Sequence, residues 1–390
     1  MKLKTIILLS LCSTLSWGQT YLLSETMTAV LDKNVLTVNT TKDAEAMPDY
    51  DWTSLPPWFE DRGGIHSAVI EDKVTSVGTW AFMHCAGLTS ISLANSVKEI
   101  GNWGFYNCYT LPSVVLSEGL TTIGIAAFLL CGSLKEIEIP ASVSFIGGSA
   151  LSECIKLEAI HVHPDNVVFS SDKGILYDKD KTELLLYPIM KSSNTFEIPG
   201  TVKKIASSAF LKSNLTSISI PNSVTEIGES AFGSCTKLTS ITIPISVTVI
   251  YDHAFQECTS LEEVTVEWDT PLELLYETFL GVDLSAVTLK VPKGRTSFYK
   301  AADGWKDFGK VVEYTFSGNA PVVTPTLNGN ASNGILHLGG LSPGKPLSIY
   351  NQNGQLLFNG TATADEMRIP LAWRGVLVVV SGGQQLKVMN

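Results

Sequence analysis

Apolar residues recur along this chain in a frame that repeats every 23 residues. Segments 215–237 and 238–260 have nearly the same sequence, LTSISIPNSVTEIGESAFGSCTK and LTSITIPISVTVIYDHAFQECTS. The leucines that open four upstream repeats follow the same spacing: Leu88, Leu111, Leu134 and Leu157. Self-similarity at a fixed period of this length is typical of a solenoid, and the pattern predicts a stack of roughly nine turns.

The sequence of each repeat predicts a turn with three sides, each of which has buried apolar residues. Within repeat 215–237, residues 217–220 alternate serine and isoleucine, which predicts a short strand with one apolar face and one hydroxylated face. Pro221 ends this strand because proline cannot donate a ladder hydrogen bond. Further apolar segments at 224–227 and 231–235 complete the turn. A single turn cannot bury these sides alone, so neighbouring turns must stack with their strands about 4.8 Å apart.

The repeat pattern LTSIxIPxSVTxIGxxAFxxC resembles the leucine-rich repeats of BspA type, also called Treponema pallidum-type repeats. The resemblance of the repeats covers residues 60–315. Segment 46–78 is also similar to the family's usual N-terminal start, and 289–308 to its closing cap. It implies a mainly β leucine-rich-repeat solenoid with 23-residue turns. It also implies a secreted or surface-displayed bacterial protein that binds other molecules, often host or neighbouring-cell components.

The repeats are expected to span 63–315 behind an N-terminal cap at 19–62. In the cap, apolar segments 26–30 and 35–38 flank Asp32-Lys-Asn34, which predicts a hairpin. The dense aromatic residues nearby either cover the open end of the solenoid or form a ligand platform: Trp52, Trp58 and Phe59.

The period breaks at 164–194, where the sequence predicts an inserted β-hairpin. Segments 169–177 and 182–187 are its two expected strands, joined by a turn at 178–180. We therefore expect the solenoid to continue on both sides of one short insertion.

The two ends of the chain differ from the repeats. Residues 1–18 have a lysine-containing start, a short apolar run and a small-residue cleavage signal, which predict a signal peptide. No other run approaches the length of a membrane span. Segment 316–333 is rich in Gly, Asn, Pro and Thr and is expected to be a linker. Residues 334–390 predict a small β-sandwich that resembles the type IX sorting domain of Bacteroidetes, although Leu377 stands where that family usually has an aromatic residue.

Charge narrows the classes of partner. Charged residues are 17% of the chain and the net charge is −11. Since no basic patch is present in the sequence, a nucleic-acid partner is not expected. A polar surface must then consist largely of Ser, Thr and Asn side chains.

Six cysteines share one slot of the repeat, three residues after an Ala-Phe pair or its variants: Cys85, Cys108, Cys131, Cys154, Cys235 and Cys258. Free cysteine is among the most buried residue types, which favours a reduced internal ladder. An even count in an exported protein also permits disulfides between adjacent turns. No CxxC motif supports structural zinc.

Catalytic motifs are missing from the sequence. It contains no GxSxG, HExxH or P-loop pattern, so we expect neither an enzyme nor a cofactor. His161, His163 and Asp165 form the one candidate metal group. Zinc sites need three or four ligands, and the third of these would lie in a turn, so we expect no metal site.

The outward row of the first strands is the more promising surface. Extended solenoids use such a continuous face for partners, although Ser and Thr are also simply tolerated on exposed strands. We hypothesise that this face binds a protein on a host or neighbouring-cell surface, with Glu136, Glu138 and His161 at its polar centre. The candidate binding residues are Ser90, Ser92, Glu136, Glu138, His161, Ser217, Ser219, Ser240 and Thr242.

Trp80 and Trp103 offer an alternative, since they lie 23 residues apart and therefore on adjacent turns. A row of flat aromatic rings can bind a sugar, which would make the chain a glycan-binding accessory protein with a polysaccharide partner. Aromatic side chains also pack commonly on neighbouring turns. Either function places the protein outside the cell, secreted or on the outer face of the cell surface.

Overall fold

The computed structural model describes residues 18–275, 277–315, 328–332, 335–341, 344–351, 355–364, 366–370, 376–381 and 384–389. It divides into two compact units at Thr315. The expected signal peptide lies outside the described residues, apart from Gly18, and so does most of the expected linker.

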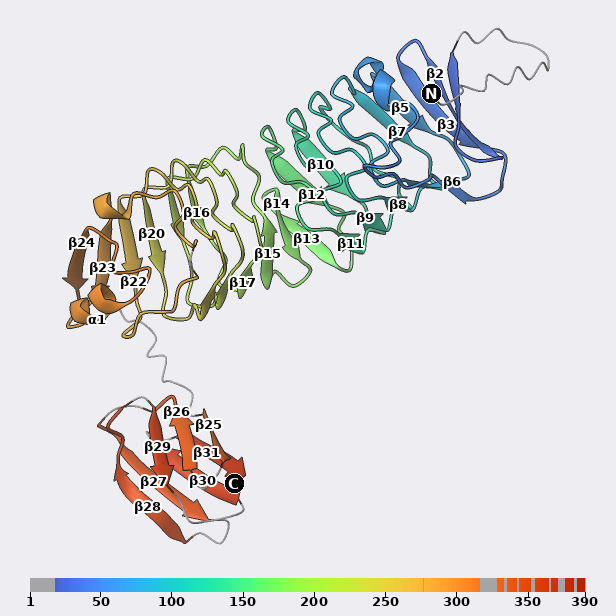
Figure 1. The fold of residues 1–390 in the computed structure, drawn as a ribbon. Helices are drawn as coiled ribbons and strands as arrows, with labels where there is room; N and C mark the ends of the chain where they lie inside the picture. The colour runs from blue at the N-terminus through green and yellow to red at the C-terminus, as the bar shows by residue number, and fades with distance from the viewer. Residues whose placement is uncertain are drawn as a thin grey trace. The chain divides into compact units, whose positions relative to one another are not determined.

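The first unit is a β-solenoid (Figure 1). The structure is 35% strand and 4% helix, and the solenoid has about 11 turns of about 23 residues. The predicted fold is therefore confirmed. The expected count of roughly nine turns was too low, because strands beyond the recognisable repeats continue the stack at both ends.

One side of the solenoid is formed by the first strand of each turn. These strands pair in parallel and in register, so that Ile218 faces Ile241 and Ser219 faces Thr242. They form separate sheets along the same side. The strands are β5 (Ser67–Ile70), β7 (Ser90–Leu93), β10 (Glu136–Ile139), β12 (Ala159–Val162), β16 (Thr195–Glu197), β18 (Ser217–Ser219), β20 (Ser240–Ile243), β22 (Glu263–Val266), β23 (Thr288–Pro292) and β24 (Lys310–Tyr314).

A second side carries shorter parallel strands. They are β4 (Glu45–Ala46), β6 (Val74–Val77), β8 (Glu99–Ile100), β9 (Thr122–Ile123), β11 (Phe145–Ile146), β17 (Lys204–Ile205), β19 (Glu226–Ile227) and β21 (Val249–Ile250). A glycine follows several of them because the turns approach closely there. A Cβ added at Gly124 would lie 2.6 Å from the backbone nitrogen of Asn102.

The third side of each turn has no strands, yet its backbone also forms a ladder. Alternate residues donate their N–H groups to the next turn, as Phe82 does to the carbonyl oxygen of Gly104 at 2.8 Å. The residues between them donate within their own turn. Two residues per turn adopt the left-handed conformation that this alternation needs, for example Trp80 and His84, both with φ of 60°.

Buried side chains form columns along the core. The Phe rings of the third side stack between adjacent turns with centroids 5.0–5.4 Å apart: Phe82, Phe105 and Phe128, then Phe210, Phe232, Phe255 and Phe279. Beside them, each cysteine thiol beyond the first turn donates to the carbonyl oxygen of an earlier Phe, as Cys108 does to Phe82 at 3.3 Å. The six cysteines in this slot are free and buried, as expected for the reduced ladder.

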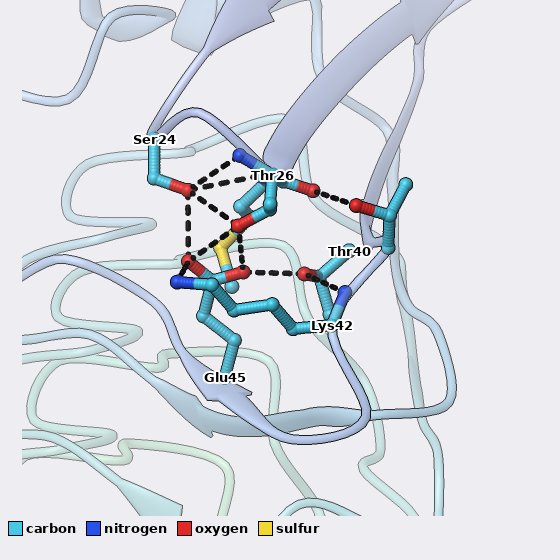
Figure 2. A network of polar contacts seen from close by, with 7 residues as sticks. Ser24, Thr26, Thr40, Lys42 and Glu45 are labelled. Carbon is cyan, nitrogen blue, oxygen red and sulfur yellow. Dashed lines mark hydrogen bonds and ion pairs between the residues drawn. The ribbon is translucent and has the colours of Figure 1, made fainter.

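The N-terminal end is closed by a three-stranded antiparallel sheet of β1 (Gln19–Leu22), β2 (Met27–Asp32) and β3 (Val35–Thr40), and β3 pairs in parallel with β5. The expected hairpin is present, with Lys33 and Asn34 at positive φ in its turn. Figure 2 shows the Glu45 carboxylate accepting hydrogen bonds from Ser24 and Thr26, at 2.8 and 2.9 Å, and from Thr40. These bonds attach β4 to the cap hairpin.

The aromatic residues of the cap do not act together. Trp58 precedes a 3₁₀ helix (Phe59–Gly64) and is 1% exposed, packed against Tyr21, Tyr50 and Phe82. Trp52 is 77% exposed, so it does not cover the open end, contrary to the capping interpretation.

The insertion differs from the predicted hairpin. Segment 169–177 is not one strand: it forms β13 (Phe169–Asp172) and β14 (Ile175–Asp178), an antiparallel pair. The reason is a turn at Lys173-Gly174, where φ is 51° and 78°. β14 then pairs with β15 (Glu183–Leu186), and β15 pairs in parallel with β17. The insertion therefore becomes part of the second side and leads directly into the next turns.

The C-terminal end of the solenoid is covered by a 3₁₀ helix (Leu284–Ala286) and helix α1 (Thr296–Ala301). Trp305 is buried there and donates its indole hydrogen bond to the carbonyl oxygen of Leu272 at 2.7 Å. Buried aromatic side chains thus close both ends of the stack.

The second unit contains two antiparallel sheets around one small core. The first sheet is β25 (Asn328–Ser332), β26 (Ile335–Gly339) and β29 (Met367–Pro370); the second is β27 (Pro346–Asn351), β28 (Leu356–Thr361), β30 (Val376–Ser381) and β31 (Gln384–Met389). β25 lies within the expected linker. It was not predicted because its sequence, Asn-Gly-Asn-Ala-Ser, has no apolar alternation that would indicate a strand. No helix in the described part of the chain is long and apolar enough to cross a membrane.

Candidate functional site

The first strands place the predicted binding residues on the outer face of the solenoid. Along β10, Glu136 and Glu138 are exposed whereas Ile137 and Ile139 are buried. The other strands alternate in the same way, so every candidate lies on the outer side. Those on the remaining strands are Ser90 and Ser92 on β7, His161 on β12, Ser217 and Ser219 on β18, and Ser240 and Thr242 on β20.

This face is not the continuous surface that the repeats predicted. The candidates lie on three separate sheets: β7 ends one, β10 and β12 form another, and β18 and β20 belong to a third. Pro112 occupies the repeat position held by Thr89 in the turn before and by Lys135 in the turn after. At that position, Thr89 and Lys135 each donate a backbone hydrogen bond to the turn that precedes them. Since proline has no N–H to donate, residues 111–116 do not form a strand. The insertion separates β12 from β16.

The break at Pro112 opens a shallow hollow of about 280 Å³ beside β10. All three residues of the predicted polar centre line it, together with Val115, Glu118 and His163. Val115 is 79% exposed, which is unusual for an aliphatic side chain next to a sheet. The hollow therefore combines an apolar surface with several ionisable groups.

The acidic groups of the hollow have a defined arrangement. Glu138 faces His161 across the β10–β12 register, and Nε2 of His161 lies 3.7 Å from Oε2 of Glu136. Three carboxylates, those of Glu118, Glu136 and Glu138, line the hollow, and no lysine or arginine does. The site is thus acidic at neutral pH, with one imidazole close enough to pair with a carboxylate.

The other two residues of the candidate metal group do not join His161. Nδ1 of His163 accepts the backbone N–H of Asp165 at 3.2 Å, whereas His161 points to Glu136. Among the residues that the structure describes, no three His, Cys, Asp or Glu side chains gather as metal ligands would.

Trp80 and Trp103 lie on adjacent turns of the third side, as the spacing predicted. Their ring centroids are 6.2 Å apart at an angle of 87°, so the rings meet edge to face and do not form a flat platform. Trp52 extends the row, 4.5 Å from Trp80 and again nearly perpendicular. The sequence offered Trp52 as part of a ligand platform in the cap, but its contact with Trp80 was not predicted because Trp52 lies outside the repeats.

The cysteines offer no nucleophile. Burial raises the pKa of the Cys85 thiol to about 12 and that of Cys235 to about 11. The thiolate is the reactive form, so these side chains serve packing and hydrogen bonding.

The fold and the exposed strand face are those of a leucine-rich repeat protein. BspA type leucine rich repeat regions match residues 57–173 and 189–302 in six copies. The chain belongs to this family. No curated protein matches its sequence.

Solved structures of bacterial leucine-rich repeat proteins are similar to the chain. A leucine-rich repeat protein from Eubacterium ventriosum is 30% identical with a TM-score of 0.59, covering 70% of this chain and 78% of its own. One from Bacteroides ovatus is 22% identical with a TM-score of 0.46, covering 76% and 75%. A leucine rich cell surface protein from Faecalibacterium prausnitzii is 22% identical with a TM-score of 0.38, covering 77% and 95%.

Proposed function

We propose that the chain is an extracellular binding or adhesion protein whose strand-face hollow recognises a protein partner. The observation that carries this proposal is the gathering of Glu136, Glu138 and His161 around one hollow beside the exposed Val115. Membership of a leucine-rich repeat family is consistent with a binding role. No group in the described part of the chain suggests covalent chemistry.

The chemistry of the hollow defines the partner's contact. A lysine or arginine side chain would pair with the carboxylates of Glu136 and Glu138, while its aliphatic stem covers Val115. The carboxylates are solvent-exposed, so their contribution is screened by salt. We therefore expect a basic segment on a host or neighbouring-cell surface protein, bound more weakly as the ionic strength rises.

Binding of the purified protein to an array of cell-surface proteins, matrix proteins and glycans tests the proposal. The triple variant Glu136→Ala, Glu138→Ala, His161→Ala is expected to lose the signal on protein spots. The matched control is Glu99→Ala with Glu229→Ala, which removes exposed carboxylates away from the hollow. If the triple variant binds its protein spots as the parent does, the strand-face hollow is not the binding site.

Glycan binding is the second candidate, supported by the row of Trp52, Trp80 and Trp103. Trp52 leaves most of its ring open to solvent, so a sugar could lie against its face. Signals on glycan spots alone, lost in Trp52→Ala and Trp80→Ala, would favour this function over protein adhesion.

The termini support an exported protein. The leader-like residues 1–18 would direct secretion, and the β unit at 334–390 would act as a sorting domain of the type IX kind at the cell surface of a Bacteroidetes bacterium. Expression of the full chain and of a chain ending at 315 in such a host tests this. Equal surface display of both would contradict a sorting role.

A further inference from the structure

The third side of the solenoid is interrupted once within residues 18–275, at the insertion. In turn after turn, alternate N–H groups donate to the carbonyls of the next turn. In the turn before the insertion, Ala126, Phe128 and Leu130 donate to Gly148, Ala150 and Ser152 at 2.8–3.2 Å. The pattern resumes beyond the insertion with donors Ser208, Phe210 and Lys212.

The turn at 147–154 repeats this conformation, but the insertion that follows does not receive its bonds. Tyr187, at the end of the insertion, already donates onward to Ala209 at 2.7 Å. Ser149 and Glu153 have φ of 57° and 56°, as Ala126 and Leu130 have 52° and 64°. Its N–H groups at Ser149, Leu151 and Glu153 are therefore aimed away from the preceding turn. No acceptor for these three groups lies within the described residues.

Two of these donors, Ser149 and Leu151, border a groove of about 260 Å³ between this turn and β15 and β17. Its lining is largely apolar and includes Leu151, Phe169 and Leu185. The Glu183–Lys204 ion pair, 3.1 Å long, lies at its rim. The Glu153–Lys212 pair, at 2.6 Å, joins this turn to the turn beyond the insertion.

We propose that this groove binds an extended peptide segment of a partner protein, which supplies the backbone carbonyls that the insertion does not provide. In the neighbouring turns at 126–130 and 208–212, the same donor spacing is matched by carbonyls of every second residue, so the occupant must present its own carbonyls at that spacing. A stretch of about five extended residues does so, because alternate carbonyls of a strand point the same way. Small apolar side chains would contact Leu151 and Leu185.

The site is independent of the strand-face hollow. It lies on another side of the solenoid and shares no lining residue with that hollow. Loss of one site therefore leaves the other available for measurement.

Hydrogen exchange tests the free donors without a ligand. In the full-length protein, the amides of Ser149 and Leu151 are expected to exchange at least about tenfold faster than those of Ala126 and Phe128, one turn earlier. Equal protection of the two turns would overturn the proposal, since the donors would then be occupied already.

A random dodecapeptide display library is the probe for binding. Enriched peptides are expected to slow exchange at 149–153 and to bind Gly148→Trp at least about tenfold more weakly. Gly148 lines the groove, and a side chain there meets no atom within 4 Å. Gly200→Trp is the matched control, because that position is equally open but outside the groove. Failure to enrich peptides that discriminate Gly148→Trp from Gly200→Trp, or occupation of the groove by a second copy of the chain, would overturn the proposal.

Discussion

The indole Nε1 of Trp58 donates a hydrogen bond to the carbonyl oxygen of Ala81 at a distance of 2.9 Å. This bond joins the N-terminal cap to the first complete turn. The ring also packs against Phe82, the first member of the Phe column, with centroids 5.8 Å apart. Trp58 thus provides both a polar and an apolar contact at the end of the stack.

Replacing Trp58 with alanine should lower the free energy of unfolding by about 3–5 kcal/mol, because a buried ring is lost and the Ala81 carbonyl is left without its donor. Urea denaturation followed by circular dichroism measures this. Trp52→Ala is the matched control and should change the free energy by less than about 0.5 kcal/mol, since that ring is largely exposed. Similar losses in both variants would show that Trp58 has no special role in capping.

Gly124→Ala should destabilise the solenoid by about 1–3 kcal/mol. The new Cβ would lie 2.6 Å from the backbone nitrogen of Asn102, and neither turn can move without disturbing its neighbours. Gly148→Ala, only one turn further along, should be neutral or slightly stabilising because nothing lies within 4 Å of its Cβ. Thermal unfolding of the two variants side by side makes the comparison; the reverse order of stability would contradict it.

The cap should weaken in acid through Glu45. Its hydrogen bonds, first of all that from Thr40, lower the pKa of the carboxyl from 4.5 to about 2. A lowered folded pKa means that the stabilisation is complete above pH 4.5 and is lost as the pH falls towards 2.

Glu45→Gln should therefore unfold at lower urea than the parent at neutral pH, and the difference should shrink as the pH falls towards 2. Asp43→Asn serves as the control, because its carboxylate is fully exposed. A difference between parent and Glu45→Gln that does not change with pH would argue against the network.

The six cysteines of the ladder should not react with thiol reagents in the folded protein. Cys85, Cys108, Cys131, Cys154, Cys235 and Cys258 are buried free thiols, and burial raises the pKa of those thiols for which a shift is resolved. A thiol-specific reagent should label these six only after denaturation, and a reducing agent should leave the unfolding midpoint unchanged. Rapid labelling of the native protein at any of these positions, identified by peptide mass, would contradict this arrangement.

The repeat frame made most of the solenoid predictable from sequence. Each opening leucine, such as Leu88 or Leu134, is buried, and strand alternation placed Glu136 and His161 on the outer face. These features depend on local spacing alone. One turn has Ser213 in the slot that a cysteine occupies in the other turns. Ser213 is also buried, and its hydroxyl lies 3.3 Å from the Cys235 sulfur, so the contact between adjacent turns is retained.

Departures from the frame were harder to predict. Pro112 interrupts the strand face through one missing N–H, and the Lys173-Gly174 turn divides segment 169–177, which was expected to form one strand. The convergence of Glu118 and Val115 on the same hollow depends on that interruption. The open donors near Ser149 could not be foreseen either, because the sequence of that turn is regular and the departure lies in the insertion that follows it.

The insertion also divides the hydrophobic core. Leu176 belongs to the core of the N-terminal turns, whereas its neighbours Ile175 and Tyr177 belong to that of the C-terminal turns. β14 is thus shared between two otherwise separate interiors. Because the two cores are separate, either array of turns could gain a repeat by internal duplication, or lose one by deletion, without repacking the other. The number of turns on the two sides can therefore evolve independently.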